Sequence, residues 1–358
     1  MLTSLSVRGY RSIRDLELDL SGPVTVVLGP NGSGKTNLYR AMYLLTAAAD
    51  GELARTLAEE GGVPSVVWAG PRRKEPVRLY VRLDTEDLAY ELSVGPNPAV
   101  PGEPEHFALD PEVKEERVYV TDRGRKVMLA ERKDRAAFLR DGEGKRVTQG
   151  DLWNGESLLV QLVDPSRFPA LWAARSLLQS FRYYHYFRTD PQAALRQPQI
   201  GIRTPKLAHD GRDLAAALQT ILQIGDGEAL ERAVDAAFPG ASIEVITEAG
   251  RFSVLMSQPG LLRPLHAREL SDGTLRYLCL LAALLSPRLP PFFALNEPET
   301  SLHPDLLGPL GDLIVEVSRR TQVWVTTHAE PLARRIEERS GRPALRVRLE
   351  NGATVLES

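Results

Sequence analysis

The segment Gly29 to Thr36 constrains this chain more than any other. It reads Gly-Pro-Asn-Gly-Ser-Gly-Lys-Thr and fits the P-loop pattern of Gly, four residues, then Gly-Lys-Ser/Thr without a mismatch. The apolar run 24–28 before it predicts a buried strand, and residues 37–46 after it predict a helix. Such a strand–loop–helix unit aims backbone N–H groups and a helix N-terminus at one anion. We therefore expect an α/β fold built around a phosphate site.

Each position of the loop has an expected role. The glycines permit the tight turn, the Lys35 ammonium lies against the β- and γ-phosphates, and the Thr36 hydroxyl ligates Mg²⁺. The alternative is a glycine-rich turn with a chance lysine, which the flanking strand and helix and the partner motifs below disfavour. The residues expected to bind nucleotide are Gly29, Pro30, Asn31, Gly32, Ser33, Gly34, Lys35, Thr36 and Asn37.

Two further strand ends carry candidate catalytic residues. A P-loop site needs an acidic strand end to hold the metal and orient a water, and the apolar run 291–295 ends in Asn296 and Glu297. Glu297 is the candidate base. The buried strand 323–327 ends at His328, which we expect to contact a γ-phosphate. A lone histidine at a strand end is more often structural, but its position after Glu297 favours a functional role.

Bulk composition sets wide limits. The 358 residues allow two to three domains, or one large α/β core with insertions. A net charge of −3 neither requires nor excludes an acidic partner such as DNA. The single cysteine, Cys279, lies in an apolar run, so a disulfide framework is excluded and a core position is expected. No signal peptide and no apolar stretch of about 20 residues are present, which indicates a cytoplasmic protein without a membrane span.

Hydrophobic periodicity predicts the order of the elements. Alternation favours strands near the N-terminus, and a helical region is expected from 156 to 238. A hairpin of 242–247 with 252–256 is expected to return the chain to the main sheet. The other predicted strands are 2–9, 13–20, 63–68, 77–83, 89–94, 117–121, 292–295, 322–326 and 345–349.

The helix predicted to begin after Ser271 completes a recognisable series. Ser271 is suited to cap it, and Gly273 permits close backbone approach. The order of P-loop, Leu-Ser-x-Gly, Asn-Glu-Pro-Glu, Ser-Leu-His-Pro and Thr-Thr-His resembles ABC-type ATPases of the RecF, SMC and OLD-like group. The N-terminal Arg-Gly-Tyr-Arg-Ser-Ile at 8–13 is similar to the RecF-like entry to that fold. The resemblance covers about 1–50 and 265–335.

This resemblance implies an α/β P-loop NTPase fold of the ABC-ATPase type, with a mixed central sheet flanked by helices, an antiparallel β lobe and a helical insertion. The expected domains are an ATPase core from 1–62 and 241–358, an antiparallel β lobe from 63–150 and a mainly helical lobe from 151–240. From Lys35 to Ser271 there are 236 positions, too many for a transporter-type domain, and no heptad hairpin suggests long SMC arms. Any nuclease would come from a separate chain.

The resemblance also implies residue roles. Glu297 polarises the attacking water, His328 senses the γ-phosphate, and the signature Ser271, Asp272 and Gly273 cap the ATP of a second subunit, which implies an ATP-bound homodimer. Arg11 is expected to reach the phosphates. Gln161 is the expected lobe-joining glutamine near Mg²⁺, with Gln149 as its competitor.

One position departs from the family pattern. Asn296 stands where aspartate is usual, next to the expected Mg²⁺. An amide can still accept a hydrogen bond from a metal-bound water, but it removes one negative charge beside the metal. We expect weakened metal affinity rather than an inactive site.

Charge within the insertion permits a role on nucleic acid. Residues 117–146 hold ten Lys or Arg against five Asp or Glu, and 163–206 hold seven against two. The stretch Phe181–Arg188 interleaves arginine and aromatic residues, either as a stacking surface or as core.

Two functions from different classes follow. The first is an ATP-hydrolysing, ATP-dimerising head that acts on DNA in repair or in defence against foreign DNA. The second is a regulatory ATP switch that controls a partner nuclease or toxin without touching DNA. A RecF-type repair loader is a third hypothesis, which the OLD-like segments at 296–304 disfavour.

Overall fold

The computed structural model describes residues 1–71, 76–97, 106–107 and 109–357. The chain forms two compact units. Unit 1 comprises Met1–Gly22, Gly29–Phe181 and Arg346–Ser358, and unit 2 comprises Pro23–Leu28 and Arg182–Leu345. The division expected from the sequence follows function rather than compactness and stays a prediction.

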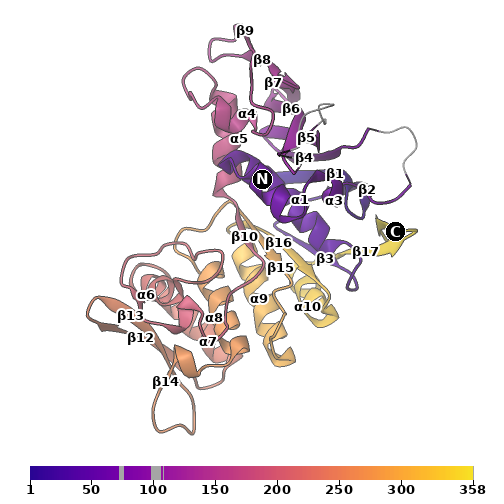
Figure 1. Cartoon of the computed structure of the whole chain (residues 1–358). Coiled ribbons are helices and arrows are strands. Elements are labelled where there is room, and N and C mark those ends of the chain that lie inside the picture. The colour runs from indigo at the N-terminus through magenta and orange to yellow at the C-terminus, as the bar shows by residue number, and fades with distance from the viewer. Residues whose placement is uncertain (72–75, 98–105, 108, 358) are drawn as a thin grey trace. The chain divides into compact units, whose positions relative to one another are not determined.

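Unit 1 is built on one antiparallel sheet of eight strands, in the order β2-β1-β4-β5-β6-β7-β8-β9 (Figure 1). The five strands predicted at 2–9, 13–20, 77–83, 89–94 and 117–121 are confirmed as β1, β2, β4, β5 and β6. The strand bounds are β1 Leu2–Tyr10, β2 Ile13–Asp19, β4 Leu79–Thr85, β5 Leu88–Pro96, β6 Pro111–Asp122, β7 Arg125–Lys133, β8 Ala136–Arg140 and β9 Arg146–Gln149. The strands of the expected antiparallel lobe thus continue the sheet that begins at the N-terminus.

Helices cover one face of this sheet. Thr46 Oγ1 of α1 donates to the carbonyl oxygen of Leu178 at 3.0 Å, so α5 lies along the C-terminal half of α1. The bounds are α1 Lys35–Asp50, α2 Leu53–Glu59, α3 Val63–Val66, α4 Leu158–Gln161 and α5 Pro169–Ser180, and a hairpin of β17 Leu345–Glu350 and β18 Ala353–Leu356 follows at the end of the chain. The strand predicted at 63–68 is wrong, because Pro64 in the first turn starts the short helix α3 instead.

Unit 2 contains a parallel sheet in the order β10-β15-β16-β3, and helices α9 and α10 pack against β16 and β3 (Figure 1). The strands are β3 Val24–Leu28, β10 Arg182–Tyr184, β15 Phe292–Asn296 and β16 Gln322–Thr327. Asn296 pairs with Thr326, and Thr327 pairs with Leu28. The carboxyl ends of β15, β16 and β3 therefore meet at one edge of the sheet.

The remaining elements of unit 2 include a second, small sheet. Its strands are β11 Gln199–Ile200, β12 Ser242–Glu248, β13 Arg251–Ser257 and β14 Leu265–His266. The hairpin β12–β13 is confirmed, but its expected return to the main sheet is wrong. The helices are α6 Leu214–Ile224, α7 Gly227–Ala237, α8 Asp272–Leu284, α9 Leu307–Ser318 and α10 Glu330–Ser340, with short 3₁₀ turns at Ala194–Arg196, Ala267–Glu269 and Pro304–Leu306.

The core of unit 2 explains two sequence features. Cys279 on α8 is fully buried, which confirms its expected place as a small core side chain, and burial raises the pKa of its thiol. Tyr184 and Phe187 are each 3% exposed in this core, and Phe181, which belongs to unit 1, is 1% exposed, so the aromatic stretch is mainly core. No helix in the described ranges is both long and apolar enough to cross a membrane.

Candidate functional site

The P-loop of unit 1 has a backbone that only glycine tolerates at its turn into α1. Gly34 is the N-cap of α1 with a left-handed φ of 99°. A Cβ added there would lie 2.0 Å from Thr354 Oγ1 and 2.7 Å from Ser12 Oγ, closer than any real contact. The loop is therefore packed from outside, and its first-turn N–H groups lie at a helix end, where a helix cannot satisfy them itself.

Lys35 is folded back over its own loop. Its Nζ donates to the carbonyl oxygens of Gly29 at 2.7 Å and Pro30 at 2.9 Å, and the residue is 3% exposed. The hydroxyl of Thr36 makes no hydrogen bond to any of the residues that the structure describes. A cation at the mouth of a glycine turn, beside an uncommitted hydroxyl, fits a phosphate group with its Mg²⁺.

Hydroxyl and amide side chains brace the loop. Thr354 Oγ1 on β18 donates to the carbonyl oxygen of Ser33 at 2.9 Å and lies 2.7 Å from Ser12 Oγ. Asn37 Nδ2 donates to the same Ser12 hydroxyl at 2.8 Å. The side chain of Asn37, expected at the nucleotide, thus holds the β1–β2 turn. Sequence reasoning missed the contacts of Thr354 with Ser12 and Ser33, because these pairs are 342 and 321 positions apart.

Arg11 lies in that same turn, with a left-handed φ of 48°. Its guanidinium donates to Glu60 Oε2 at 2.8 Å, and Tyr10 Oη donates to the same oxygen at 2.8 Å. Arg40 on α1 lies 3.6 Å from Glu60 Oε1. Burial, with the neighbouring Glu60 carboxylate, raises the pKa of Tyr10. Arg11 is thus next to Ser12 of the loop brace, and Glu60, which sequence reasoning missed, fixes its head group.

The structure does not bring Gln161 to the P-loop. Gln161 ends α4, and the neighbouring Val160 lies 3.7 Å from the Cβ position of Gly51, just past the C-terminal end of α1. The 16 residues of α1 separate that end from Thr36 by about 24 Å. The Gln161 amide instead bonds the backbone at Trp153 and Glu156. Its competitor Gln149 lies on β9, where its amide donates to the carbonyl oxygen of Gly150 at 3.4 Å.

In unit 2 the acidic strand end is a closed hydrogen-bonded group. Asn296 is 1% exposed, and its Oδ1 accepts from Thr326 Oγ1 at 2.7 Å. Its Nδ2 lies 2.7 Å from His185 Nδ1. One lone pair of Oδ1 stays available, so the amide can still accept a hydrogen bond from a metal-bound water. His185 was not expected here from the sequence.

The structure brings Glu297 and His328 together. His328 Nδ1 lies 3.9 Å from Glu297 Oε1 and 3.1 Å from Glu299 Oε1. Glu297 has a left-handed φ of 47°, a strained conformation that recurs at functional sites, and its N–H donates to the carbonyl oxygen of Thr326 at 2.8 Å. The side chain of Glu297 is 28% exposed, so it can meet a water.

Glu299 is a missed member of this group. Its Oε1 accepts from Thr327 Oγ1 at 2.6 Å and from the N–H of His328 at 2.8 Å. The residue is only 7% exposed, so its carboxylate holds the end of β16 and orients the His328 ring from inside. Its place in the Asn-Glu-Pro-Glu segment was the one signal that could have found it.

The signature helix α8 begins as predicted. Ser271 Oγ accepts from the N–H of Thr274 at 3.1 Å, which confirms the N-cap. Arg196 donates to Asp272 Oδ1 at 2.6 Å and to the carbonyl oxygen of Leu270 at 2.8 Å, and so fixes the entry to the helix. One turn on, Arg276 donates to the carbonyl oxygen of Glu297 at 3.3 Å, and burial lowers the pKa of its guanidinium. Sequence reasoning missed both arginines.

Gly273 allows α8 to touch the turn after Glu297. A Cβ at this position would lie 2.5 Å from the carbonyl oxygen of Ser301. We expect Gly273→Ala to lower the free energy of unfolding by about 1–3 kcal/mol, because backbone must move to relieve the clash. Thermal denaturation is the measurement. Gly308→Ala is the control: Gly308 is also the second residue of its helix, but its Cβ position is open, so a change within about 1 kcal/mol is expected there. Equal losses in both variants would contradict the clash.

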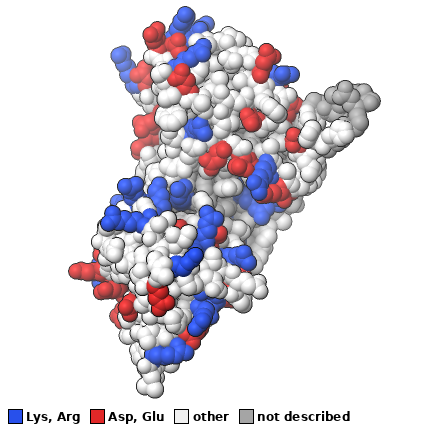
Figure 2. All heavy atoms as spheres, turned by 60° about the vertical axis from the view of Figure 1, so that its left-hand side comes forward, with Lys and Arg blue, Asp and Glu red and all other residues white. Residues whose placement is uncertain are grey.

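Part of the positive charge in 117–146 is neutralised by ion pairs within the sheet. Arg117 pairs with Glu91, Glu115 and Glu131, and Lys133 pairs with Glu131. Figure 2 shows acidic and basic side chains interspersed on the face of unit 1 that it presents, and more uniformly basic side chains on unit 2. The sequence count therefore overstates the free charge of these strands.

Comparison with known proteins supports the expected ABC-type ATPase fold. Residues 24–333 match the family described as "AAA domain, putative AbiEii toxin, Type IV TA system". A solved SMC head bound to the C-terminal winged-helix domain of ScpA covers 99% of this chain and 97% of its own, at a TM-score of 0.57 and 15% identity. The Pyrococcus furiosus Smc head with an extended coiled coil gives a TM-score of 0.55 at 14% identity. These two likenesses concern the fold.

Curated relatives match over short segments. The RecF protein of Anaeromyxobacter dehalogenans is 46% identical over 68 residues, 17% of this chain and 18% of that protein. The Smc protein of Clostridium kluyveri is 32% identical over 95 residues, 25% of this chain and 8% of that protein. The OLD nuclease of Thermus scotoductus is 47% identical over 45 residues, 13% and 8%. The chain thus spans less than a fifth of these relatives' length. It belongs to the AAA-domain family that matches 24–333 and is a RecF/SMC/OLD-like ABC-type ATPase by fold.

Proposed function

We propose that the chain binds ATP at the P-loop and hydrolyses it. The observation that carries the proposal is the parallel order β15-β16-β3 in unit 2. Glu297 follows β15, His328 follows β16, and Gly29 is the next residue after β3, so all three start from the same edge of one sheet. Ligands of open α/β sheets bind beyond this edge.

Each residue has a distinct task in the proposed reaction. Lys35 exchanges its two carbonyl acceptors for β- and γ-phosphate oxygens, and the first turn of α1 donates N–H groups to the same anion. Thr36 would ligate Mg²⁺, which would neutralise charge on the phosphates when bound, and Asn296 would accept a hydrogen bond from a metal-bound water. Glu297 accepts the proton of the attacking water. His328, oriented by Glu299, donates a hydrogen bond to the γ-phosphate.

The signature helix α8 is the basis for proposing that the chain forms a homodimer when it binds ATP. The side chain of Ser271 and the N-terminus of α8 are suited to stabilise the γ-phosphate held by a second copy. Closure on ATP and reopening after hydrolysis would be a shift of population, driven by contacts made only in the closed dimer. Comparing the mass of Glu297→Gln with and without ATP tests this step, and a monomer in both conditions contradicts it.

There are two candidates for the macromolecule on which the ATP cycle acts. One is DNA, in repair or in defence against foreign DNA, and the short identities to RecF, Smc and OLD proteins support it. The other is a partner toxin or nuclease under the control of an ATP switch, which the toxin–antitoxin description of the family supports. A cytoplasmic location fits both. DNA titration of the ATP-bound Glu297→Gln variant separates them, because only the first requires binding.

Removing the P-loop lysine tests nucleotide binding itself. We expect Lys35→Ala to weaken ATP binding about 10–100-fold, because a charge-assisted hydrogen bond contributes about 1.5–3 kcal/mol. Titration with a fluorescent ATP analogue in Mg²⁺ is the measurement. Lys145→Ala, an exposed lysine in unit 1, is the control and should bind as wild type does. An unchanged ATP affinity in Lys35→Ala would show that the P-loop is not the ATP-binding site.

A further inference from the structure

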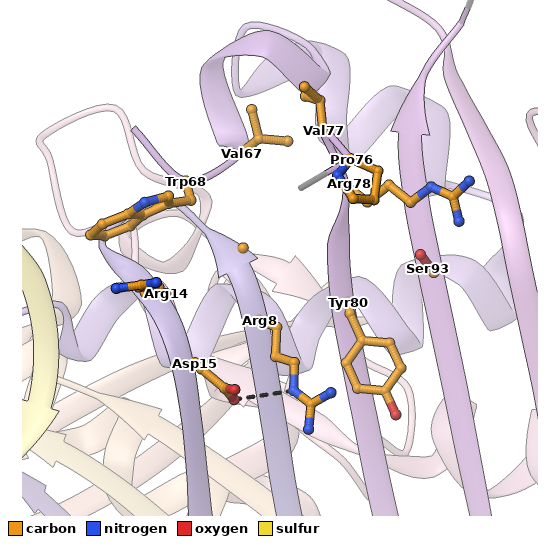
Figure 3. A pocket seen from close by; sticks show the side chains of 11 residues that line it. Arg8, Arg14, Asp15, Val67, Trp68, Pro76, Val77, Arg78, Tyr80 and Ser93 are labelled. Atoms are coloured by element: carbon orange, nitrogen blue, oxygen red, sulfur yellow. Dashed lines mark hydrogen bonds and ion pairs between the residues drawn. The ribbon is translucent and has the colours of Figure 1, made fainter. Parts of the chain in front are cut away.

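Unit 1 has a second candidate binding site outside the P-loop. A pocket of about 490 Å³ opens where β1, β2 and β4 meet the segments before β4. Its charged and aromatic lining consists of Arg8, Arg14, Asp15, Trp68, Arg78 and Tyr80 (Figure 3). Its volume is within the range of small-molecule sites, and its lining includes no residue of Gly29–Thr36.

Three guanidinium groups contribute donors to this pocket. Arg8 Nε donates to Asp15 Oδ1 at 3.1 Å, which leaves its terminal N–H groups for another acceptor. Arg78 uses one terminal nitrogen on Glu115 at 3.0 Å. Arg14 is exposed and has no ion pair with any part of the chain that the structure describes. The pocket therefore keeps one uncompensated positive charge and spare N–H donors from two further arginines.

Aromatic rings lie beside these cations. Tyr80 lies under Arg8, whose guanidinium carbon is 5.4 Å from the ring centroid. Figure 3 shows Trp68 at the side of the pocket where Arg14 lies. The backbone N–H of Trp68 donates to the carbonyl oxygen of Gly9 on β1 at 2.8 Å, so the segment that carries the indole is attached to the sheet. Trp68 is 7% exposed, so its indole is fixed by packing and presents only a small part of its surface to the pocket.

We propose that this pocket binds a nucleoside phosphate, with the base against the Tyr80 ring and the small exposed part of Trp68, and the phosphate on Arg14 and the remaining N–H groups of Arg8. Aromatic rings next to arginines suit a ligand that has both a flat base and an anion. An acidic peptide would use the charge but not the rings. The ligand has two sources, a free nucleotide or one unit of a single-stranded nucleic acid. The proposal is independent of hydrolysis at the P-loop.

The experiment must distinguish binding in this pocket from binding at the P-loop. Binding is therefore measured in the Lys35→Ala background with EDTA. A labelled ten-residue oligothymidylate is followed by anisotropy, and thymidine monophosphate by calorimetry. We expect Arg14→Ala to weaken the affinity for either ligand about tenfold. For the oligonucleotide, the slope of log affinity against log salt concentration should fall by about one, which corresponds to one phosphate contact. Arg8→Ala should weaken it as well. The control is Arg146→Ala on β9, an exposed arginine in the strand at the opposite end of the same sheet.

Two results would support the proposal or identify the ligand. A loss of affinity in Arg14→Ala but not in Arg146→Ala would support binding in this pocket, and the ligand with the higher affinity per nucleotide would be its source. No binding of either ligand, or equal loss in both variants, overturns the proposal. Competition by inorganic phosphate or by a polyglutamate peptide at the same concentration as thymidine monophosphate overturns it too, because the rings would then contribute nothing. None of these outcomes bears on the proposal that the P-loop binds ATP, because the P-loop lysine is absent from the protein used.

Discussion

Glu297→Gln is expected to lower ATP hydrolysis about 10²–10⁴-fold and to leave ATP affinity within about threefold of wild type. General-base catalysis contributes a factor of this size, and glutamine keeps the shape of the side chain while losing its basicity. The left-handed backbone at Glu297 and the Arg276 bond to its carbonyl oxygen do not involve the carboxylate, so the turn should persist. Phosphate release under saturating ATP measures the rate.

Glu316→Gln is the matched control. Glu316 is an exposed carboxylate of α9 in the same unit, so its loss should not change the rate. Hydrolysis by Glu297→Gln equal to that of wild type would show that Glu297 is not the base. His328→Gln supplies a second measurement: a fall in rate with unchanged affinity would agree with contact to the γ-phosphate in the transition state.

Arg132→Ala is expected to lower the free energy of unfolding of unit 1 by about 3–5 kcal/mol. Arg132 on β7 is fully buried, and its guanidinium lies 3.6 Å from the fully buried Glu116 carboxylate. It also donates to the carbonyl oxygens of Asp134 at 2.6 Å, Glu156 at 2.5 Å and Trp153 at 2.7 Å. Removing the guanidinium leaves the buried Glu116 carboxylate without its ion pair and the Asp134 carbonyl group without this donor, whereas Gln161 still donates to the carbonyl oxygens of Trp153 and Glu156. Breaking a buried pair in this way costs far more than the pair contributes.

Thermal denaturation followed by circular dichroism measures this loss. A change of this size corresponds to a fall in melting temperature of about 10 °C for a unit of this length. Lys133→Ala is the control, because the neighbouring Lys133 side chain is 58% exposed and its pair with Glu131 is a surface one. A melting temperature within 2 °C of wild type for both variants would mean that water replaces the guanidinium.

Local sequence signals predicted the parts of the site that depend on neighbouring residues. The P-loop turn, the Ser271 cap and the strand ends at Glu297 and His328 are each set by residues within one turn or one strand. Their periodicity and capping chemistry are visible without tertiary structure. These predictions place the side chains on the correct elements.

Contacts between distant segments could not be predicted in the same way. Glu60, Arg196 and Thr354 act through partners 49, 76 and 321 positions away, and no periodicity marks such pairs. The family resemblance implies a lobe-joining glutamine, but which glutamine lies near the P-loop depends on how α4 packs along α1, and residue type alone does not show that. The strands β7–β9 were missed because their exposed faces carry charges in place of the alternation that marks a half-buried strand.

The brace from Thr354 has a consequence for biosynthesis. Ser33 leaves the ribosome long before Thr354, which follows 321 positions later and donates to its carbonyl oxygen. A nascent chain can form β1, β2 and α1 early, yet the loop between them lacks its outer support until the last hairpin emerges. We therefore expect a nascent chain that lacks Thr354 to bind nucleotide more weakly than a chain in which this hydrogen bond is made.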